Sequence, residues 1–143
     1  MKRNGFTLVE LMVVLAVLGL MAAVVVVAIP DGAMTVAAEG ERFAARLKRA
    51  QEEAVLVNRP VEVTTTDDGY GFRVRKAGAW QALDEGPFEA EAWLPGTVLA
   101  ADVRRVTFDP TGVADPARFT LRRSGKAVEV LVDQAGNVRV DAG

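Results

Sequence analysis

Residues that commonly carry catalysis are scarce in this chain of 143 residues. It contains no histidine and no cysteine, and its single serine, Ser124, lies in a predicted turn. The lack of histidine removes the commonest general base and metal ligand. The lack of cysteine removes disulfides, thiolate zinc sites and cysteine nucleophiles. We therefore expect no catalytic residues, no metal site and no cofactor, and the composition favours a protein that is not an enzyme.

One carboxylate has an unusual position. Glu10 is the only charged residue in the segment 6–29, of whose 24 residues 21 are apolar. The stretch 11–29 has no charge and no proline, and as a helix it would extend about 28 Å, close to the thickness of the hydrocarbon core of a bilayer. An acid at the bilayer centre costs on the order of 2.5–3.5 kcal/mol, so Glu10 is a functional candidate.

Two ordinary membrane signals leave features of this segment unexplained. A cleaved secretory signal needs an apolar core of about 7–15 residues followed directly by a small-residue site. The candidate site Val36-Ala37-Ala38 ends nine residues after Ile29. An uncleaved anchor fits Lys2 and Arg3, which would remain on the cytoplasmic side, but it gives Glu10 no role.

The leader resembles a known signal. Residues Gly5-Phe6-Thr7-Leu8-Val9-Glu10, behind a short basic start, resemble the class III signal of type IV prepilins and type II secretion pseudopilins. The resemblance implies that a prepilin peptidase cuts between Gly5 and Phe6, removes the leader 1–5 and N-methylates Phe6. It also implies that Glu10 pairs with the terminal amine of a neighbouring subunit during filament assembly, and that 6–29 forms the transmembrane and filament-core helix in the bacterial inner membrane.

The segment 31–143 is predicted to form one globular, periplasmic domain. Pro30 ends or kinks the first helix. Apolar residues then recur at spacings of three and four, which predicts an amphipathic helix over about 35–57 that packs on a sheet of the same chain rather than in a coiled coil. Its predicted buried stripe is Val36, Gly40, Phe43, Leu47, Ala50, Ala54 and Val57.

Alternating residues predict strands between about 61 and 140. The predicted strands are 61–66, 70–76, 79–83, 103–108, 117–123, 127–133 and 137–140. The segment 84–96 is predicted to be a loop with Trp93 and Leu94 tucked in. A helix followed by strands indicates an α+β fold in which the helix packs on antiparallel sheet.

Later parts of the chain resemble the minor pseudopilin H (GspH/FimT) group. They are the helical pattern 42–54 with the following 58–61, the run 106–112 and the closing segment 130–140. The resemblance implies a pilin-like fold and a minor subunit that joins other pilins or pseudopilins at an inner-membrane assembly platform, initiating the filament or lying at its tip. Major pilins commonly have a proline where this chain has Val27, and they often have a disulfide. The lack of cysteine favours a minor subunit.

A second class of function rests on arginines. Some minor pilins of DNA-uptake machines bind DNA, and six arginines on predicted strands or turns are candidate phosphate contacts: Arg73, Arg75, Arg104, Arg105, Arg122 and Arg123. Against this, the segment after Pro30 has 15 basic and 18 acidic residues.

Other candidate sites have simpler interpretations. The acid pairs Asp67-Asp68 and Asp84-Glu85 lie in predicted turns, and Trp80 and Trp93 are predicted to anchor the core or a loop. A membrane-anchored enzyme would need convergent polar groups, for which the sequence has no pattern. The choice among a secretion pseudopilus, a motility pilus and a competence pilus stays open.

Overall fold

The computed structural model describes residues 7–28 and 34–143, and it describes side chains over 7–21 and 34–143. The chain divides into two compact units, Met1–Ala33 and Met34–Gly143. The first contains helix α1 (Leu8–Ala28), and the second, which we call the head, contains every other element. Gly5, Phe6, Ile29 and Pro30, on which several sequence predictions depend, lie outside the described residues.

Helix α1 is apolar around its whole circumference. Its large apolar side chains from Leu8 to Met21 are exposed within the chain, for example Leu8 at 77% and Leu20 at 73%. Among the described residues, no helix is long and apolar enough to cross a membrane.

Helix α2 (Val36–Val57) confirms the predicted amphipathic helix, and local residues define both of its ends. The Thr35 hydroxyl accepts a hydrogen bond from Ala38 N at 3.1 Å, as an N-cap should. Asn58 adopts the left-handed conformation with φ of 52° and closes the last turn, and Pro60 follows it. The predicted face is buried from Val36 to Ala54, but Val57 is 37% exposed because the last turn extends beyond the sheets.

The first sheet holds β1 (Val61–Thr65), β2 (Gly69–Lys76), β3 (Ala79–Leu83), β4 (Glu91–Ala92) and β6 (Arg105–Phe108). Its order is β3-β2-β1-β6. Strand β4 pairs with Gly69 and Tyr70 of β2, ahead of the part of β2 that pairs with β3. All pairs are antiparallel, and Val63 lies opposite both Phe72 and Val106. These three residues are buried, so they define the face of the sheet toward the core.

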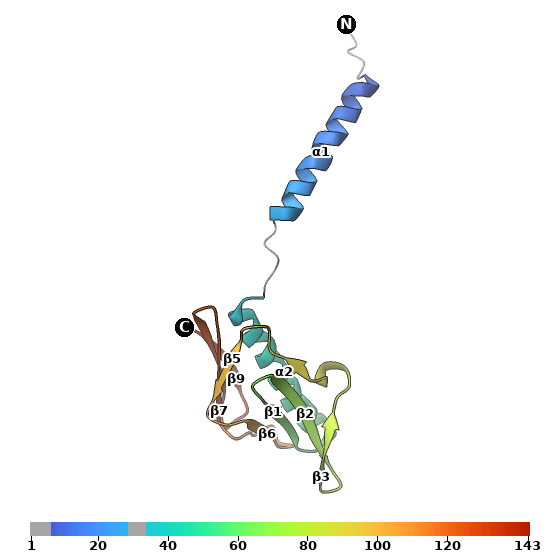
Figure 1. The fold of residues 1–143 in the computed structure, drawn as a ribbon. Coiled ribbons are helices and arrows are strands. Elements are labelled where there is room, and N and C mark those ends of the chain that lie inside the picture. Colours follow the sequence, from blue (N-terminus) through green and yellow to red (C-terminus); the bar gives the residue numbers. More distant parts are fainter. Residues whose placement is uncertain (1–6, 29–33) are drawn as a thin grey trace. The chain divides into compact units, whose positions relative to one another are not determined.

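The second sheet holds β5 (Val98–Ala101), β7 (Ala117–Arg123), β8 (Lys126–Val132) and β9 (Val138–Ala142) in the order β5-β7-β8-β9. It is also antiparallel throughout. Both sheets pack against α2 (Figure 1). Gly40 allows close contact with β8, since a Cβ on this residue would lie 2.7 Å from Val128 Cγ1.

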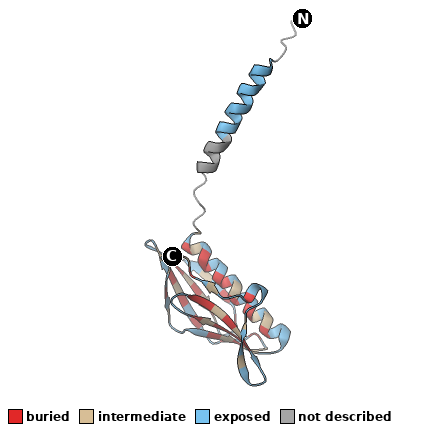
Figure 2. Cartoon of the chain, turned by 45° about the vertical axis from the view of Figure 1, so that its right-hand side comes forward, coloured by how far each residue is buried: buried red, intermediate tan, exposed pale blue. Residues whose placement is uncertain are grey.

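The core lies between α2 and the two sheets, where the buried residues of the head gather (Figure 2). Phe43 of α2 is its centre. Its ring lies 4.7 Å from that of Tyr70 in the first sheet and 5.2 Å from that of Phe119 in the second. One helical side chain thus joins both sheets, and the α+β fold with a helix on antiparallel sheet is confirmed.

The predicted loop and its flanks need correction. The segment 84–96, predicted as a loop, contains the 3-10 turn η1 (Gly86–Phe88) and the short strand β4. Strand β5 follows it and was not predicted. The next strand, β6, begins at Arg105 rather than at 103. These short strands have two and four residues, too few for an alternating pattern to be visible. Partners distant in sequence, β2 and β7, stabilise them.

Candidate assembly and binding sites

The start of α1 places Glu10 in the first helical turn. Thr7 Oγ1 accepts a hydrogen bond from Glu10 N at 3.3 Å, and the Thr7 carbonyl accepts one from Leu11 N at 3.2 Å. Thr7 therefore caps the helix. The amino-terminal end of a helix dipole favours a negative charge there by about 0.3–1 kcal/mol. The Glu10 side chain is exposed, so it is accessible to a cation from another molecule.

In the head, a second carboxylate is buried. Glu39 is 6% exposed and lies on the apolar face of α2. It accepts hydrogen bonds from Leu94 N and Thr97 Oγ1, each at 2.7 Å, and from Arg123 Nη1 at 3.2 Å. Arg123 also donates to the Met34 carbonyl. This buried pair joins the beginning of the head to the second sheet.

A third carboxylate, Glu91, joins α2 to β4. It forms ion pairs with Arg42 Nε and Arg46 Nη1, each at 3.0 Å, and it accepts a hydrogen bond from the Tyr70 hydroxyl at 3.3 Å. Burial, reinforced by the negative charge of Glu91, raises the pKa of Tyr70 far above its usual value. Tyr70 therefore remains a neutral donor to the carboxylate at any ordinary pH. Neither Glu39 nor Glu91 had been singled out from the sequence.

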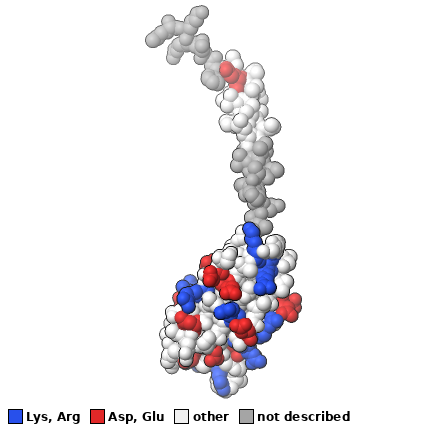
Figure 3. Space-filling model, turned by 90° about the vertical axis from the view of Figure 1, so that its left-hand side faces the viewer, with Lys and Arg blue, Asp and Glu red and all other residues white. Residues whose placement is uncertain are grey.

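The six candidate arginines do not share one surface. Arg73, Arg75 and Arg105 belong to the first sheet, with Arg104 directly before β6, whereas Arg122 and Arg123 belong to β7 of the second sheet. Arg104 pairs with Asp67 at 2.8 Å, and Arg123 is occupied by buried Glu39. Basic and acidic side chains are interleaved on the face of the head seen in Figure 3. This arrangement does not favour a continuous phosphate-binding track.

The two candidate tryptophans lie in different environments. Trp93 is buried, and its Nε1 donates to the Thr66 carbonyl at 3.0 Å, so it anchors the loop as predicted. Trp80 is partly exposed on β3. Over the residues that the structure describes, acidic side chains form no group of three that could hold a metal ion.

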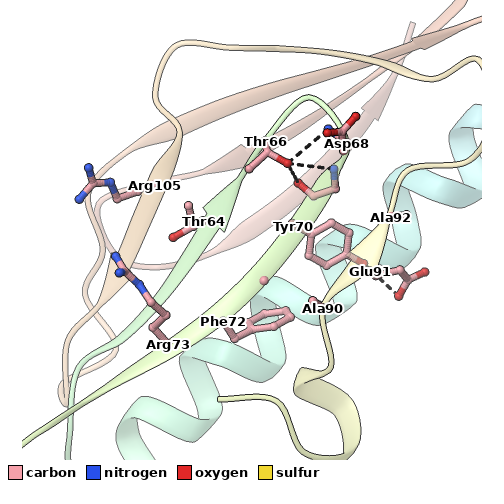
Figure 4. A pocket seen from close by; sticks show the side chains of 12 residues that line it. Thr64, Thr66, Asp68, Tyr70, Phe72, Arg73, Ala90, Glu91, Ala92 and Arg105 are labelled. Atoms are coloured by element: carbon pink, nitrogen blue, oxygen red, sulfur yellow. Dashed lines mark hydrogen bonds between the residues drawn. The ribbon is translucent and has the colours of Figure 1, made fainter. Parts of the chain in front are cut away.

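A groove of about 710 Å³ lies along β1 and β2 (Figure 4). Its lining includes Thr64, Thr66, Gly71, Arg73, Ala90 and Arg105. The glycine leaves the middle of the groove without a side chain. Sequence patterns had not indicated this groove, because it requires β1, β2 and β6 to lie side by side.

Comparisons with known proteins agree with this architecture. Residues 39–136 match the family of type II transport protein GspH, and residues 1–26 match the prokaryotic N-terminal methylation motif. The type II secretion system protein H of Aeromonas hydrophila is 34% identical over 104 residues, which are 70% of this chain and 57% of that protein. The chain therefore spans little more than half the length of this relative.

Solved structures show the same fold. The minor pseudopilin EpsH of Vibrio cholerae superposes with a TM-score of 0.65 at 18% identity, covering 73% of this chain and 94% of EpsH. The type IV minor pilin FimU of Pseudomonas aeruginosa gives 0.59 at 18% identity, covering 74% and 87%. The fold is the one these solved structures share, and the chain carries the N-terminal methylation motif ahead of it. The chain belongs to the GspH family of type II transport proteins.

Proposed function

We propose that this chain is a minor subunit of a type II secretion pseudopilus or a closely related pilus-like filament. The observation that carries the proposal is Glu10, the only charge on α1, which lies within an N-terminal methylation motif. The large apolar side chains described around it, from Leu8 to Met21, are exposed. A helix that is apolar all round is normally buried among other helices or in lipid. Membership of the GspH family supports the same role.

The processing step follows from the motif. A prepilin peptidase cuts between Gly5 and Phe6, because glycine at the cut gives the enzyme close access to the backbone, and Phe6 becomes the N-methylated first residue. Before cleavage the chain crosses the inner membrane once, with its amino terminus in the cytoplasm and the head in the periplasm. The uncharged stretch 11–29 supports this topology, as does the basic start.

Assembly then depends on Glu10. At a separation of 4 Å and an effective dielectric constant near 20, a carboxylate and an amine attract each other by about 4 kcal/mol before desolvation is subtracted. An amine at Phe6 of a neighbouring subunit would supply the cation. The pair would fix the axial position of adjacent helices as the assembly platform adds the subunit, at the initiation of the filament or at its tip.

Mass spectrometry of the chain expressed with and without prepilin peptidase tests the proposal. We expect a mature chain that begins at N-methylated Phe6 only when the peptidase is present, and cross-links from that chain to other pilins of the same filament. Gly5→Val serves as the control that blocks cleavage. A chain that keeps Met1 in the presence of the peptidase, or one that begins after Ala38, would refute it.

Uptake of DNA is not favoured as an alternative. The candidate arginines are divided between two sheets, and three of them, Arg73, Arg104 and Arg123, are paired with acids.

A further inference from the structure

The first sheet has a solvent-facing side that the proposed filament role does not use. In β2, Tyr70, Phe72 and Val74 point to the core, so the alternating residues Arg73 and Arg75 point outward. Register places Thr64 opposite Arg105, and Arg75 opposite Trp80. Residues opposite each other in a sheet share a face. We call the outward set Arg73, Arg75, Arg105 and Trp80 the arginine face.

The charges of this face are unbalanced. Glu62 is the only acid that β1, β2, β3 and β6 direct outward, and it is 4% exposed. It accepts from Arg73 Nε at 3.0 Å and from Thr64 Oγ1 at 3.1 Å. Within the described residues, no carboxylate forms an ion pair with Arg75 or Arg105. Both are exposed, so two positive charges remain for a partner.

Trp80 adds an aromatic surface. The guanidinium carbons of Arg73 and Arg75 lie 5.8 Å and 5.9 Å from its ring centre, within cation–π range. These contacts hold the indole on the sheet while part of it stays exposed. A partly exposed indole in contact with these guanidinium groups offers an apolar surface beside the unpaired charge of Arg75.

The groove gives this face its shape. Figure 4 shows Thr64, Arg73 and Arg105 on one side of the strands and Tyr70 and Phe72 on the other. At Gly71 a backbone can approach closely, since the position has no side chain. From Gly71 to Arg75 the strand extends about 13 Å, and four strands span about 14 Å. This area accommodates about four residues of an extended chain.

We infer that the arginine face and its groove bind a short, extended, acidic segment of a partner protein. Carboxylates of the segment pair with Arg75 and Arg105, its backbone lies over Gly71, and an apolar side chain contacts Trp80. A short segment fits better than a long polyanion such as DNA, because Asp68 lines the same groove and would repel a chain that continued past the arginines.

Binding can be measured with the full chain in phosphatidylcholine nanodiscs. The probe is an end-blocked hexapeptide of alternating glutamate and valine carrying a fluorophore, followed by anisotropy. The matched control peptide replaces glutamate by glutamine. We expect saturable binding of the acidic peptide, a change in Trp80 emission, and affinity at least tenfold weaker for the glutamine peptide. Added salt should weaken the acidic peptide's binding.

Variants assign the site. The double variant Arg75→Gln and Arg105→Gln should weaken binding at least tenfold. Gly71→Val should fill the groove and weaken binding without unfolding the head, because a Cβ at this position meets only Ala90 Cβ, at 3.7 Å. The matched control is Arg118→Gln with Arg122→Gln, two exposed arginines of the second sheet. Equal loss in the control variant, unchanged affinity in the double variant, or equal binding of the glutamine peptide would overturn the inference. Tighter binding of a thymidine hexanucleotide would also overturn it, in favour of nucleic acid.

Discussion

Glu10 and Glu39 are the same residue type in opposite situations. Glu39 is buried within the head, where a backbone amide, a hydroxyl and a guanidinium donate to it. Glu10 is exposed on α1, and no described residue forms an ion pair with it. The head supplies the partners of its own buried acid, so it is complete as a fold. The first helix carries an acid without an ion-pair partner among the described residues, and the proposed function gives it a partner in another subunit.

The largest expected effect is the loss of the acid inside the head. Glu39→Ala should destabilise the head by about 3–5 kcal/mol, because it leaves the largely buried Arg123 without its counter-charge. Urea denaturation of the full chain in non-ionic detergent, followed by Trp93 fluorescence, measures the change. Glu39→Leu combined with Arg123→Met should recover most of the loss.

Glu52→Ala is the matched control on the same helix. Glu52 pairs with Arg49, and both side chains are 66% exposed, so its loss should cost less than about 1 kcal/mol. Equal destabilisation by Glu39→Ala and Glu52→Ala would show that the buried pair has no special role.

The second effect concerns assembly instead of folding. Glu10→Gln should leave cleavage and the urea midpoint of the head unchanged, while it lowers incorporation into filaments by about tenfold or more, since a pair worth a net 1.4 kcal/mol accounts for tenfold. Co-purification with sheared filaments measures incorporation. Glu10→Asp, which keeps the charge, should retain part of it; normal incorporation of Glu10→Gln would remove this residue from the mechanism.

A smaller effect is expected at the junction of the two regions. Thr35→Ala removes the side-chain cap of α2 and should destabilise the head by about 1 kcal/mol. Thr35→Ser should restore stability, because its hydroxyl can accept from Ala38 N in the same way. A urea midpoint that is the same for Thr35→Ala and the unmodified chain would contradict the capping role.

The smallest expected effect is a fall in the stability of the head at acid pH. Hydrogen bonds from the Thr111 hydroxyl to Asp109, and from the Asn137 side chain to Asp133, lower the pKa of both carboxyl groups. Because the folded pKa lies below the unfolded one, the stabilisation is present above about pH 4 and is lost as the pH falls through the folded values. The urea midpoint is measured between pH 6 and pH 3. It should fall less steeply in the double variant Asp109→Asn and Asp133→Asn than in the control variant Asp115→Asn.

Local features of the fold were predictable because local residues cause them. Thr35 caps α2, Asn58 and Pro60 end it, and the alternating residues of β2 and β7 identify those strands. The contacts that sequence reasoning missed join distant residues. Glu39 and Arg123 are 84 positions apart, and Arg46 and Glu91 are 45 apart. An acid three residues after Val36 and four before Phe43, on the apolar stripe, was nevertheless a signal that Glu39 would be buried with a partner.

The sequence by itself determined the class of the protein, since the amino-terminal motif and the single acid in an apolar run are contiguous and need no folding to be recognised. It also determined the ends of α2, because caps act within one helical turn. Only the tertiary structure decided that the strands form two sheets. It also directed Arg73, Arg75 and Arg105 to one face and turned Arg123 inward. Those outcomes depend on which strands pair and on which acid is buried beside which base, and long-range packing selects both.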